Sequence, residues 1–494
     1  MRRVPLLSGS RVVLVPAGED DVVVRPPAPP ERVVDVEAAV RDALRFPLSG
    51  APLDALVTSG GRATIVVEPA ALPLPGAPQD ARQSAIAVTI AELGRSGVPD
   101  ERQTILVAGG LGRRFGQRDL ERLLSRPQAR AFRGQVVVHD AEDESLVPVG
   151  GARLHPALVE TDLVVTVTAA ETVLHGGPGA LIAACDAATI RRVAGADSLL
   201  EATGSPAWAL GLELEAAVRA GAALAGVSLV LDLPRLTGMF RGYPDDLAQV
   251  NRLARSPLRA AFSLLPSALR RDLLGGQGRR MDSTGAFAGP PSVAHAEALL
   301  RGIALRGTRL DEPVDALVVG VPWIGPHVPR EPLNPITVAA VALGLALRLR
   351  RDAFPIRPGG SLVLIHPLTR SFAHGTQAPH ATMFNALRTA RDREELAEAE
   401  RAAAIDERAL AAYRAGAAGH PLLPYADWAG CAPALSRLGR VIVAGCRDAS
   451  AARTLGFVPS HGMSSALEMA HGVAGGRARL GILLAPPYAP LLVG

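Results

Sequence analysis

A short, uncharged and partly β-branched run near the middle of the chain leads into a glycine-rich turn. Residues 163–168 contain only Leu, Val and Thr, which is typical of a strand buried on both faces of a parallel sheet. The turn contains Gly176, Gly177 and Gly179, and the alanine-rich residues 180–193 are expected to be helical. Backbone N–H groups at such a turn can hold an anion without a basic side chain. Alternatively, the glycines serve only to let strand and helix pack closely.

The same alternation of apolar strands and helical segments recurs along most of the chain. It predicts an α/β protein with two doubly wound parallel-sheet domains facing a central cleft. We expect an N-terminal domain in residues 1–235, a glycine- and proline-rich insertion or boundary in 236–291, and a C-terminal domain in 292–494. Within the C-terminal domain, residues 336–351 and 389–415 are each expected to form one helix.

The basic residues are all arginine: the chain has 52 Lys+Arg residues and no lysine. A side-chain amine for a Schiff base or for tethering a cofactor is therefore absent. The net charge is +4, but arginine and acidic residues are interspersed and form no basic stripe, which argues against nucleic-acid binding. Apolar runs are too short for a membrane span, and the three cysteines match neither a disulfide nor a zinc pattern. We therefore expect a cytoplasmic protein with no membrane partner.

Two segments next to predicted strands carry candidate ligand-binding groups. Residues 109–116, GGLGRRFG, combine Gly110, Gly112 and Arg113 in a loop that offers backbone N–H groups and a guanidinium to a phosphate or carboxylate. His175 lies beside the central turn and is the candidate for proton transfer, although it could equally cap the turn.

A third segment, HPLTRSFAHGTQAPH, follows the strand expected to end at residue 365. His366, His374 and His380 are candidate metal ligands, but their spacing matches no established metal motif. In the same segment Thr369, Arg370 and Ser371 are candidates for binding a carboxylate. The chain has no Gly-x-Ser-x-Gly and no His-Glu-x-x-His motif, so the sequence gives no support for a serine hydrolase or a zincin.

The order of elements and several local motifs resemble the lactate racemase family, whose members use a nickel-pincer nucleotide to racemise or epimerise 2-hydroxyacids. The matching stretches are FPLSGAPLDAL from residue 46, ILVAGGLGRRFGQRDL from 105, ETDLVVTVTAAETVLHGGPG from 160, TGAFAGPPSVAHAEAL from 284 and the tail from 455. The resemblance implies two α/β domains with the cofactor in the cleft between them.

The positions that carry the chemistry of that family differ in this chain. Where the family has an Asp-His-Thr-Arg-Pro motif, residues 69–73 read PAALP, with Leu72 in place of the arginine. The resemblance places the first catalytic histidine at Gly112, the cofactor-tethering lysine at Gly179 and the nickel-binding histidine near Gly195. The segment of the second catalytic histidine is shortened before His175.

Two functions follow from this comparison. The first is a divergent protein that keeps the cleft for a nucleotide or small carboxylate and lacks the usual racemase chemistry. The second is an active isomerase, a 2-hydroxyacid racemase or epimerase, that holds a nickel-pincer nucleotide without a lysine tether and uses relocated histidines. The sequence leaves both open, together with the oligomeric state.

Overall fold

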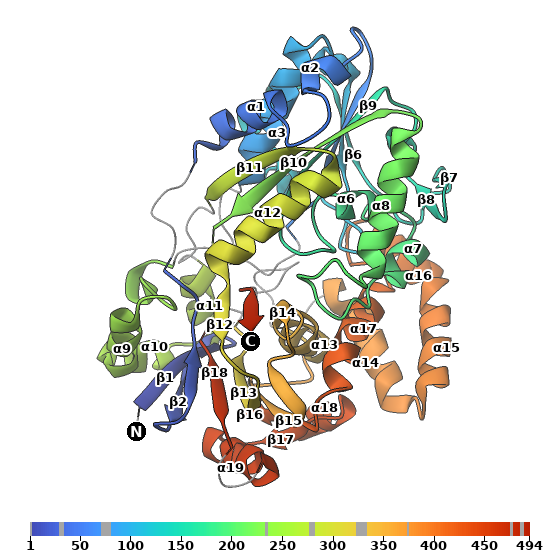
Figure 1. Cartoon of the computed structure of the whole chain (residues 1–494). Coiled ribbons are helices and arrows are strands. Elements are labelled where there is room, and N and C mark those ends of the chain that lie inside the picture. The colour runs from blue at the N-terminus through green and yellow to red at the C-terminus, as the bar shows by residue number, and fades with distance from the viewer. Residues whose placement is uncertain are drawn as a thin grey trace.

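The computed structural model describes residues 2–28, 34–70, 81–232, 236–275, 282–322, 333–372, 375–474, 478–484 and 489–494. Two six-stranded sheets form its two halves, drawn above and below one another in Figure 1. The first sheet has the strand order β11 (Ser283–Gly289), β10 (Ala223–Leu231), β9 (Leu163–Ala169), β4 (Ala63–Val67), β5 (Gln103–Val107) and β6 (Gln135–Val138). All neighbours in it are parallel except β10 and β11.

Strand β9 confirms the expectation of a strand buried on both faces, because all seven of its residues are buried. Val165 and Val167 pack in one hydrophobic cluster, whereas Val164 packs in a second cluster on the other face. Alternation of side chains along the strand sends neighbours to opposite faces. Helices therefore cover both sides of the sheet, as the predicted α/β class requires.

The second sheet is parallel throughout. Its order is β17 (Val458–Ser460), β16 (Arg440–Ala444), β15 (Ile356–Ile365), β13 (Val314–Gly320), β18 (Leu480–Leu483) and β3 (Val22–Val24). Three small sheets complete the structure: β1 (Arg2–Ser8) with β2 (Arg11–Ala17), β7 (Val147–Val149) with β8 (Ala152–Leu154), and β12 (Thr308–Leu310), β19 (Leu491–Val493) and β14 (Arg350–Asp352).

The helices of the first half pack around the first sheet. They are α1 (Val36–Arg45), α2 (Leu53–Leu56), α3 (Ala81–Arg95), α4 (Gln117–Leu120), α5 (Arg126–Ala131), α6 (Gly179–Ile182), α7 (Ala187–Arg192) and α8 (Pro206–Arg219). Helix α12 (Pro291–Arg306) packs on β10 and β11 and then leads toward the second half (Figure 1).

The remaining helices belong to the second half or to the segment before it. They are α9 (Leu247–Arg255), α10 (Pro257–Leu264), α11 (Ser267–Gly275), α13 (Pro335–Ala339), α14 (Ala378–Thr389), α15 (Arg393–Ala404), α16 (Glu407–Arg414), α17 (Leu423–Leu435), α18 (Ala449–Thr454) and α19 (Met463–Ala474). Among the described residues, none of the helices has the length and apolar character needed to cross a membrane.

The chain passes between the two sheets more than once. Strand β3 comes from the N-terminal segment but lies at the edge of the second sheet, and β11 comes from residues 236–291 but lies at the edge of the first. The same region also forms α9, α10 and α11. The division at residues 235 and 291 remains a prediction.

Three expected helices are wrong in extent. Residues 180–193 form two short helices, because Asp186 caps the start of α7. Residues 389–415 are divided among the end of α14, α15 and α16, because Asp392 and Asp406 accept N–H bonds and start new helices. Residues 336–351 leave the helix for a π-helical turn at Ala340–Ala346 and end in β14.

Candidate functional site

Three buried carboxyl groups stand where three neighbouring strands of the first sheet end. Glu68 follows β4, Glu171 lies two positions after β9, and Asp232 follows β10. Since β4, β9 and β10 are adjacent and parallel, these residues share one edge of the sheet. The chain runs outward from β4 to β6 and then returns to β9 on the other side of β4. Doubly wound sheets bind their ligands at the carboxyl ends of the strands where the order reverses in this way.

Glu68 is tied to the glycine turn. Its carboxyl oxygen Oε2 accepts a hydrogen bond of 2.6 Å from the backbone N–H of Gly176. Burial raises the pKa of Glu68 to about 8; the Gly176 N–H and the Arg82 charge oppose that rise, and the Glu171 charge adds to it. At neutral pH this carboxyl group is therefore mostly protonated and can donate as well as accept a hydrogen bond.

Two buried arginines face the other two carboxylates. Arg82, in the first turn of α3, forms an ion pair of 2.8 Å with Glu171, and both side chains are only 2% exposed. Arg306, at the end of α12, is also buried. Burial lowers the pKa of Arg306, whereas Glu171 and Asp232 raise it. The charges of two arginines and two carboxylates balance, which is the condition for burying them at a tolerable cost.

Two histidines flank the same turn. His295 of α12 is fully buried, and burial lowers its pKa to about 4, so the ring is neutral at physiological pH. Its Nε2 donates to the Thr172 carbonyl at 2.9 Å, and Nδ1 lies 3.4 Å from the Ser228 hydroxyl. His175, half-buried, places Nδ1 2.9 Å from the Thr172 hydroxyl. This hydrogen bond between His175 and Thr172 is the one expected of a histidine that caps the turn.

The turn requires glycine for two physical reasons. Gly176 and Gly177 have backbone φ values of 103° and 52°, which residues with a side chain rarely adopt. A Cβ on Gly176 would overlap the Ala169 carbonyl and lie 2.5 Å from His295 Cε1, and one on Gly177 would overlap the His295 side chain. Close packing of α12 against the turn is thus one reason for the glycines.

The turn N–H groups have protein acceptors. Gly176 donates to Glu68, Gly177 donates to the Thr168 hydroxyl at 2.9 Å, and Gly179 donates to the Gly176 carbonyl. An external anion would have to displace these acceptors. Binding of an anion by Gly176, Gly177 and Gly179 therefore stays a prediction.

The loop at residues 109–116 lies against the second half of the molecule. Arg113 pairs with Asp119 at 2.7 Å and reaches the Gly416 carbonyl at 3.3 Å. Arg114 donates to the Arg414 carbonyl at 2.8 Å.

The backbone of this loop is also bonded within the protein. The N–H of Gly110 donates to the Ala183 carbonyl and that of Gly112 to the Gly109 carbonyl. The predicted ligand groups thus take part in the contact between the two halves of the chain, and their role toward a ligand remains a prediction.

The candidate metal ligands are spread over the second half. His366 is buried after β15, and His380 lies 3.3 Å from Asp427 across α14 and α17. His374 lies outside the described residues. Within the described part of the chain, no three His, Cys, Asp or Glu residues are grouped so as to hold a metal ion.

The carboxylate-binding candidates of the same loop lie at the surface. Arg370 is exposed and donates to the Asn385 amide oxygen at 3.1 Å. The N–H of Ser371 donates to the Thr369 carbonyl at 2.8 Å.

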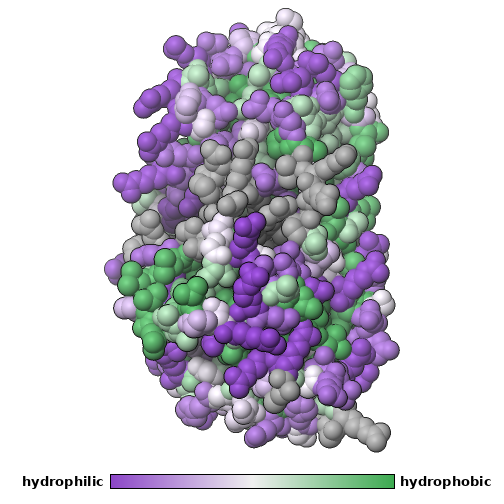
Figure 2. Space-filling view, turned by 90° about the vertical axis from the view of Figure 1, so that its left-hand side faces the viewer, coloured by the Kyte–Doolittle hydropathy of each residue, from purple (hydrophilic) through white to green (hydrophobic). Residues whose placement is uncertain are grey.

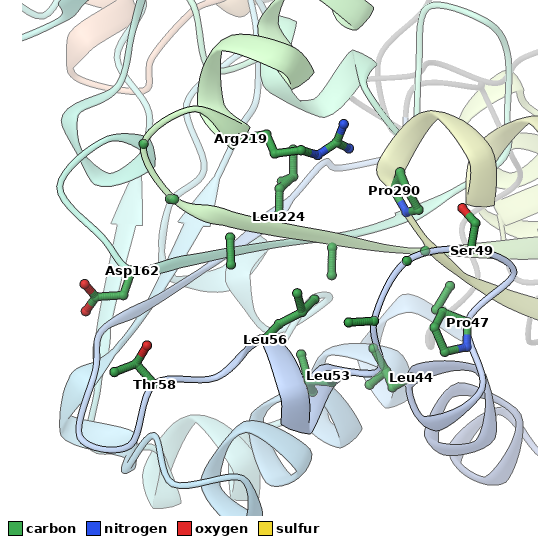
Figure 3. A pocket seen from close by; sticks show the side chains of 18 of the residues that line it. Leu44, Pro47, Ser49, Leu53, Leu56, Thr58, Asp162, Arg219, Leu224 and Pro290 are labelled. Atoms are coloured by element: carbon green, nitrogen blue, oxygen red, sulfur yellow. The ribbon is translucent and has the colours of Figure 1, made fainter.

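A cavity of about 560 Å³ lies at the opposite end of the first sheet (Figure 3). It is lined by the start of β10, the end of α8 and the loop around α2, and its charged residues are Asp162 and Arg219. Both have protein partners: Asp162 accepts the Arg62 N–H at 2.8 Å, and Arg219 donates to Glu215 at 2.7 Å. The cavity is separate from the carboxyl edge that carries the buried charges.

The sequence reasoning missed most of this charged network. Its members are Glu68, Arg82, Glu171, Asp232, His295 and Arg306. A usable signal was present, because each of the three acids follows a buried strand within two residues. Acids placed directly after parallel strands meet at one sheet edge, whatever their separation in sequence.

Fold and site together define a two-domain α/β protein with a buried charged network at the switch point of its first sheet. Residues 9–172 match the family model of the lactate racemase N-terminal domain. Residues 9–172 therefore form a lactate racemase N-terminal domain, and the resemblance inferred from the sequence is confirmed over these residues.

Two solved structures share the fold. The lactate racemase apoprotein from Thermoanaerobacterium thermosaccharolyticum superposes with a TM-score of 0.62 at 13% identity, covering 99% of this chain and 100% of that one. A protein from Thermotoga maritima superposes with a TM-score of 0.51 at 11% identity, covering 93% of this chain and 100% of that one. At these identities the likeness is one of fold. A comparison with curated proteins found no match.

Proposed function

We propose that this protein binds a nucleotide or a small carboxylate in an interdomain cleft, at the carboxyl edge of the first sheet, and does not perform the racemase chemistry of its family. The observation that carries the proposal is the buried network at the ends of β4, β9 and β10. Arg82 and Arg306 supply guanidinium groups, which bind carboxylate and phosphate well. Protonated Glu68 adds an O–H group that can donate a hydrogen bond to a ligand oxygen.

The residues do not fit a lysine-tethered nickel-pincer nucleotide. The chain has no lysine, and the resemblance puts Gly179 at the tether position. A Cβ at Gly179 would overlap the Leu174 carbonyl oxygen, so no side chain can be accommodated there without movement of the backbone. The absence of an amine and the packing at this position both speak against a covalently held cofactor.

The histidines near the turn also favour binding over racemisation. Racemisation of a 2-hydroxyacid needs a base on each face of the reacting carbon. His295 is held neutral by burial, and both its ring nitrogens lie within hydrogen-bonding distance of protein oxygens. Among the described residues at this turn, His175 is then the one half-buried imidazole.

Ligand-induced thermal stabilisation tests the proposal. Lactate, other 2-hydroxyacids and AMP are added to the wild-type protein and to Arg306→Gln. Arg301→Gln, on the exposed face of the same helix, is the control. We expect at least one ligand to raise the wild-type Tm, since about 2.7 kcal/mol is gained at 100 times Kd.

The expected stabilisation is lost in Arg306→Gln and kept in Arg301→Gln. Glu68→Ala, which removes the proposed donor, serves as a second variant in case Arg306→Gln does not fold. The proposal is wrong if no ligand stabilises the wild type, or if the network variants respond as Arg301→Gln does.

A further inference from the structure

The turn between β1 and β2 covers the carboxyl edge of the second sheet. The N–H of Gly9 donates to the Val321 carbonyl, just past the end of β13, at 2.7 Å. A Cβ on Gly9 would lie 3.5 Å from Pro367 and 3.8 Å from His366 Nε2, both just past the end of β15. The turn therefore lies over the ends of two adjacent parallel strands, at the edge where α/β sheets bind ligands.

Arg270 reaches this turn from α11. Its Nε donates to the Ser10 carbonyl at 3.0 Å, and its Nη1 donates to the carbonyls of Ser263 and Leu265. The residue is only 5% exposed. Its Nη2 forms no hydrogen bond with any residue that the structure describes. The guanidinium is thus fixed in place with one donor group left for a ligand.

Two further arginines lie near enough to Arg270 for their charges to act on it. Arg11 begins β2 beside Ser10, and Arg447 follows β16, with its backbone N–H donating to the Leu368 carbonyl at 3.2 Å. Both side chains are exposed, and neither forms an ion pair or hydrogen bond with the described residues. Burial first, and then the charges of Arg11 and Arg447, lower the pKa of Arg270. No carboxylate contributes to that shift.

His366 adds an unused polar group at the same edge. It is 6% exposed, and its buried Nδ1 has no hydrogen-bond partner among the described residues. Burial lowers its pKa to about 4, so it offers a neutral ring.

Figure 2 views the molecule from the side that carries α9–α11 and shows a stripe of hydrophilic side chains between hydrophobic areas there.

We propose that Arg11, Arg270 and Arg447 form a binding site for the phosphate group of a phosphorylated small molecule at the carboxyl edge of the second sheet. No carboxylate among the described residues forms an ion pair with these three guanidinium groups, so they repel one another, and a phosphate dianion relieves that repulsion. The planar fork of arginine matches phosphate oxygens with paired N–H donors. This site lies on a different sheet from Glu68, Arg82 and Arg306 and does not depend on their function.

Calorimetric titration of the full chain at low ionic strength tests the site. The probes are inorganic phosphate, AMP and, as the control without phosphate, adenosine. We expect phosphate and AMP to bind and adenosine not to bind. Arg11→Gln combined with Arg447→Gln removes two exposed guanidinium groups that form no hydrogen bond or ion pair with the described residues. It should weaken binding at least about tenfold, as expected for lost charged hydrogen bonds.

Arg393→Gln is the control for the loss of one positive charge, because Arg393 is an exposed arginine on α15, and it is compared with each single variant and with the double variant. It should leave the affinity for phosphate within about twofold, since exposed charges at a distance are screened by salt. In Arg306→Gln, the part of phosphate binding that Arg11→Gln with Arg447→Gln removes should persist, which separates this site from the first sheet. The proposal is overturned if neither phosphate nor AMP binds, if adenosine binds as AMP does, or if the double variant binds like Arg393→Gln.

Discussion

The side chain of Glu68 and the backbone of Gly176 are joined by a hydrogen bond of 2.6 Å. This bond connects the end of β4 with the turn after β9, across the point where the strand order of the first sheet reverses. It also places an acid against a backbone N–H that, by its position, is suited to an anionic ligand. The properties of this one carboxyl group therefore affect both stability and ligand binding.

Stability should fall between about pH 4.5 and pH 8 because of Glu68. Its folded pKa, about 8, lies above its ordinary value of 4.5. The folded state therefore holds a proton that the unfolded state releases, and this contribution is lost as the pH rises toward 8. We expect Glu68→Gln, which stays neutral, to remove a pH dependence on the order of a few kcal/mol. Urea unfolding of both proteins at pH 5, 7 and 9 measures the free energy of unfolding at each pH. If this free energy depends on pH in the same way in the wild type and in Glu68→Gln, the raised pKa of Glu68 is contradicted.

The glycine turn should tolerate no side chain. Gly177→Ala combines a φ of 52° with overlap against His295, so we expect a loss of about 2–4 kcal/mol. Gly110→Ala is the control, because Gly110 has a φ of 54° but nothing within 4 Å of a Cβ, and should cost about 1 kcal/mol. Thermal unfolding compares the two. Equal losses would show that packing against α12 is unimportant.

The ion pair of Arg82 and Glu171 should show strong coupling. Arg82→Met leaves a buried carboxylate without this partner, which costs about 3–5 kcal/mol, and adding Glu171→Leu should restore part of that loss. The exposed pair of Arg301 and Glu297 gives the comparison and should couple by less than about 0.5 kcal/mol. Double-mutant cycles from denaturant unfolding give both values. Similar coupling energies for the two pairs would refute the importance of burial here.

Arg114 should hold the two halves of the chain together. It donates to the Arg414 carbonyl on α16 and to the Val138 carbonyl at the end of β6. We expect Arg114→Ala to raise amide hydrogen exchange in α16 and in residues 109–116 more than elsewhere. Arg130→Ala, on α5, has no partner among the described residues and is the control. A uniform change across the protein, or no change, would argue against a junction at this loop.

The sequence predicted the strands well because burial on both faces leaves a clear mark. Runs such as residues 63–67 and 163–168 are apolar or β-branched throughout, and they became β4 and β9. Helix ends were harder to predict. A single aspartate, such as Asp392 or Asp406, starts a new helix within a segment whose overall composition is helical.

The charged network could not be assembled from spacing alone. Glu68 and Gly176 are more than one hundred residues apart and meet only because β4 and β9 are neighbours in the sheet. His295 and Arg306 come from a helix beyond the insertion and pack onto the same edge. Strand order, which local sequence does not encode, decides which of these residues meet.

The most direct test of the central claim is a combined metal and chirality measurement on the chain expressed together with enzymes that make the nickel-pincer nucleotide. Nickel is determined in the purified protein, and a panel of single-enantiomer 2-hydroxyacids is followed by chiral chromatography. Because the chain has no lysine and Gly179 leaves no room for a side chain, we expect no stoichiometric nickel and no loss of chirality. One nickel per chain together with racemisation of any 2-hydroxyacid would contradict the claim.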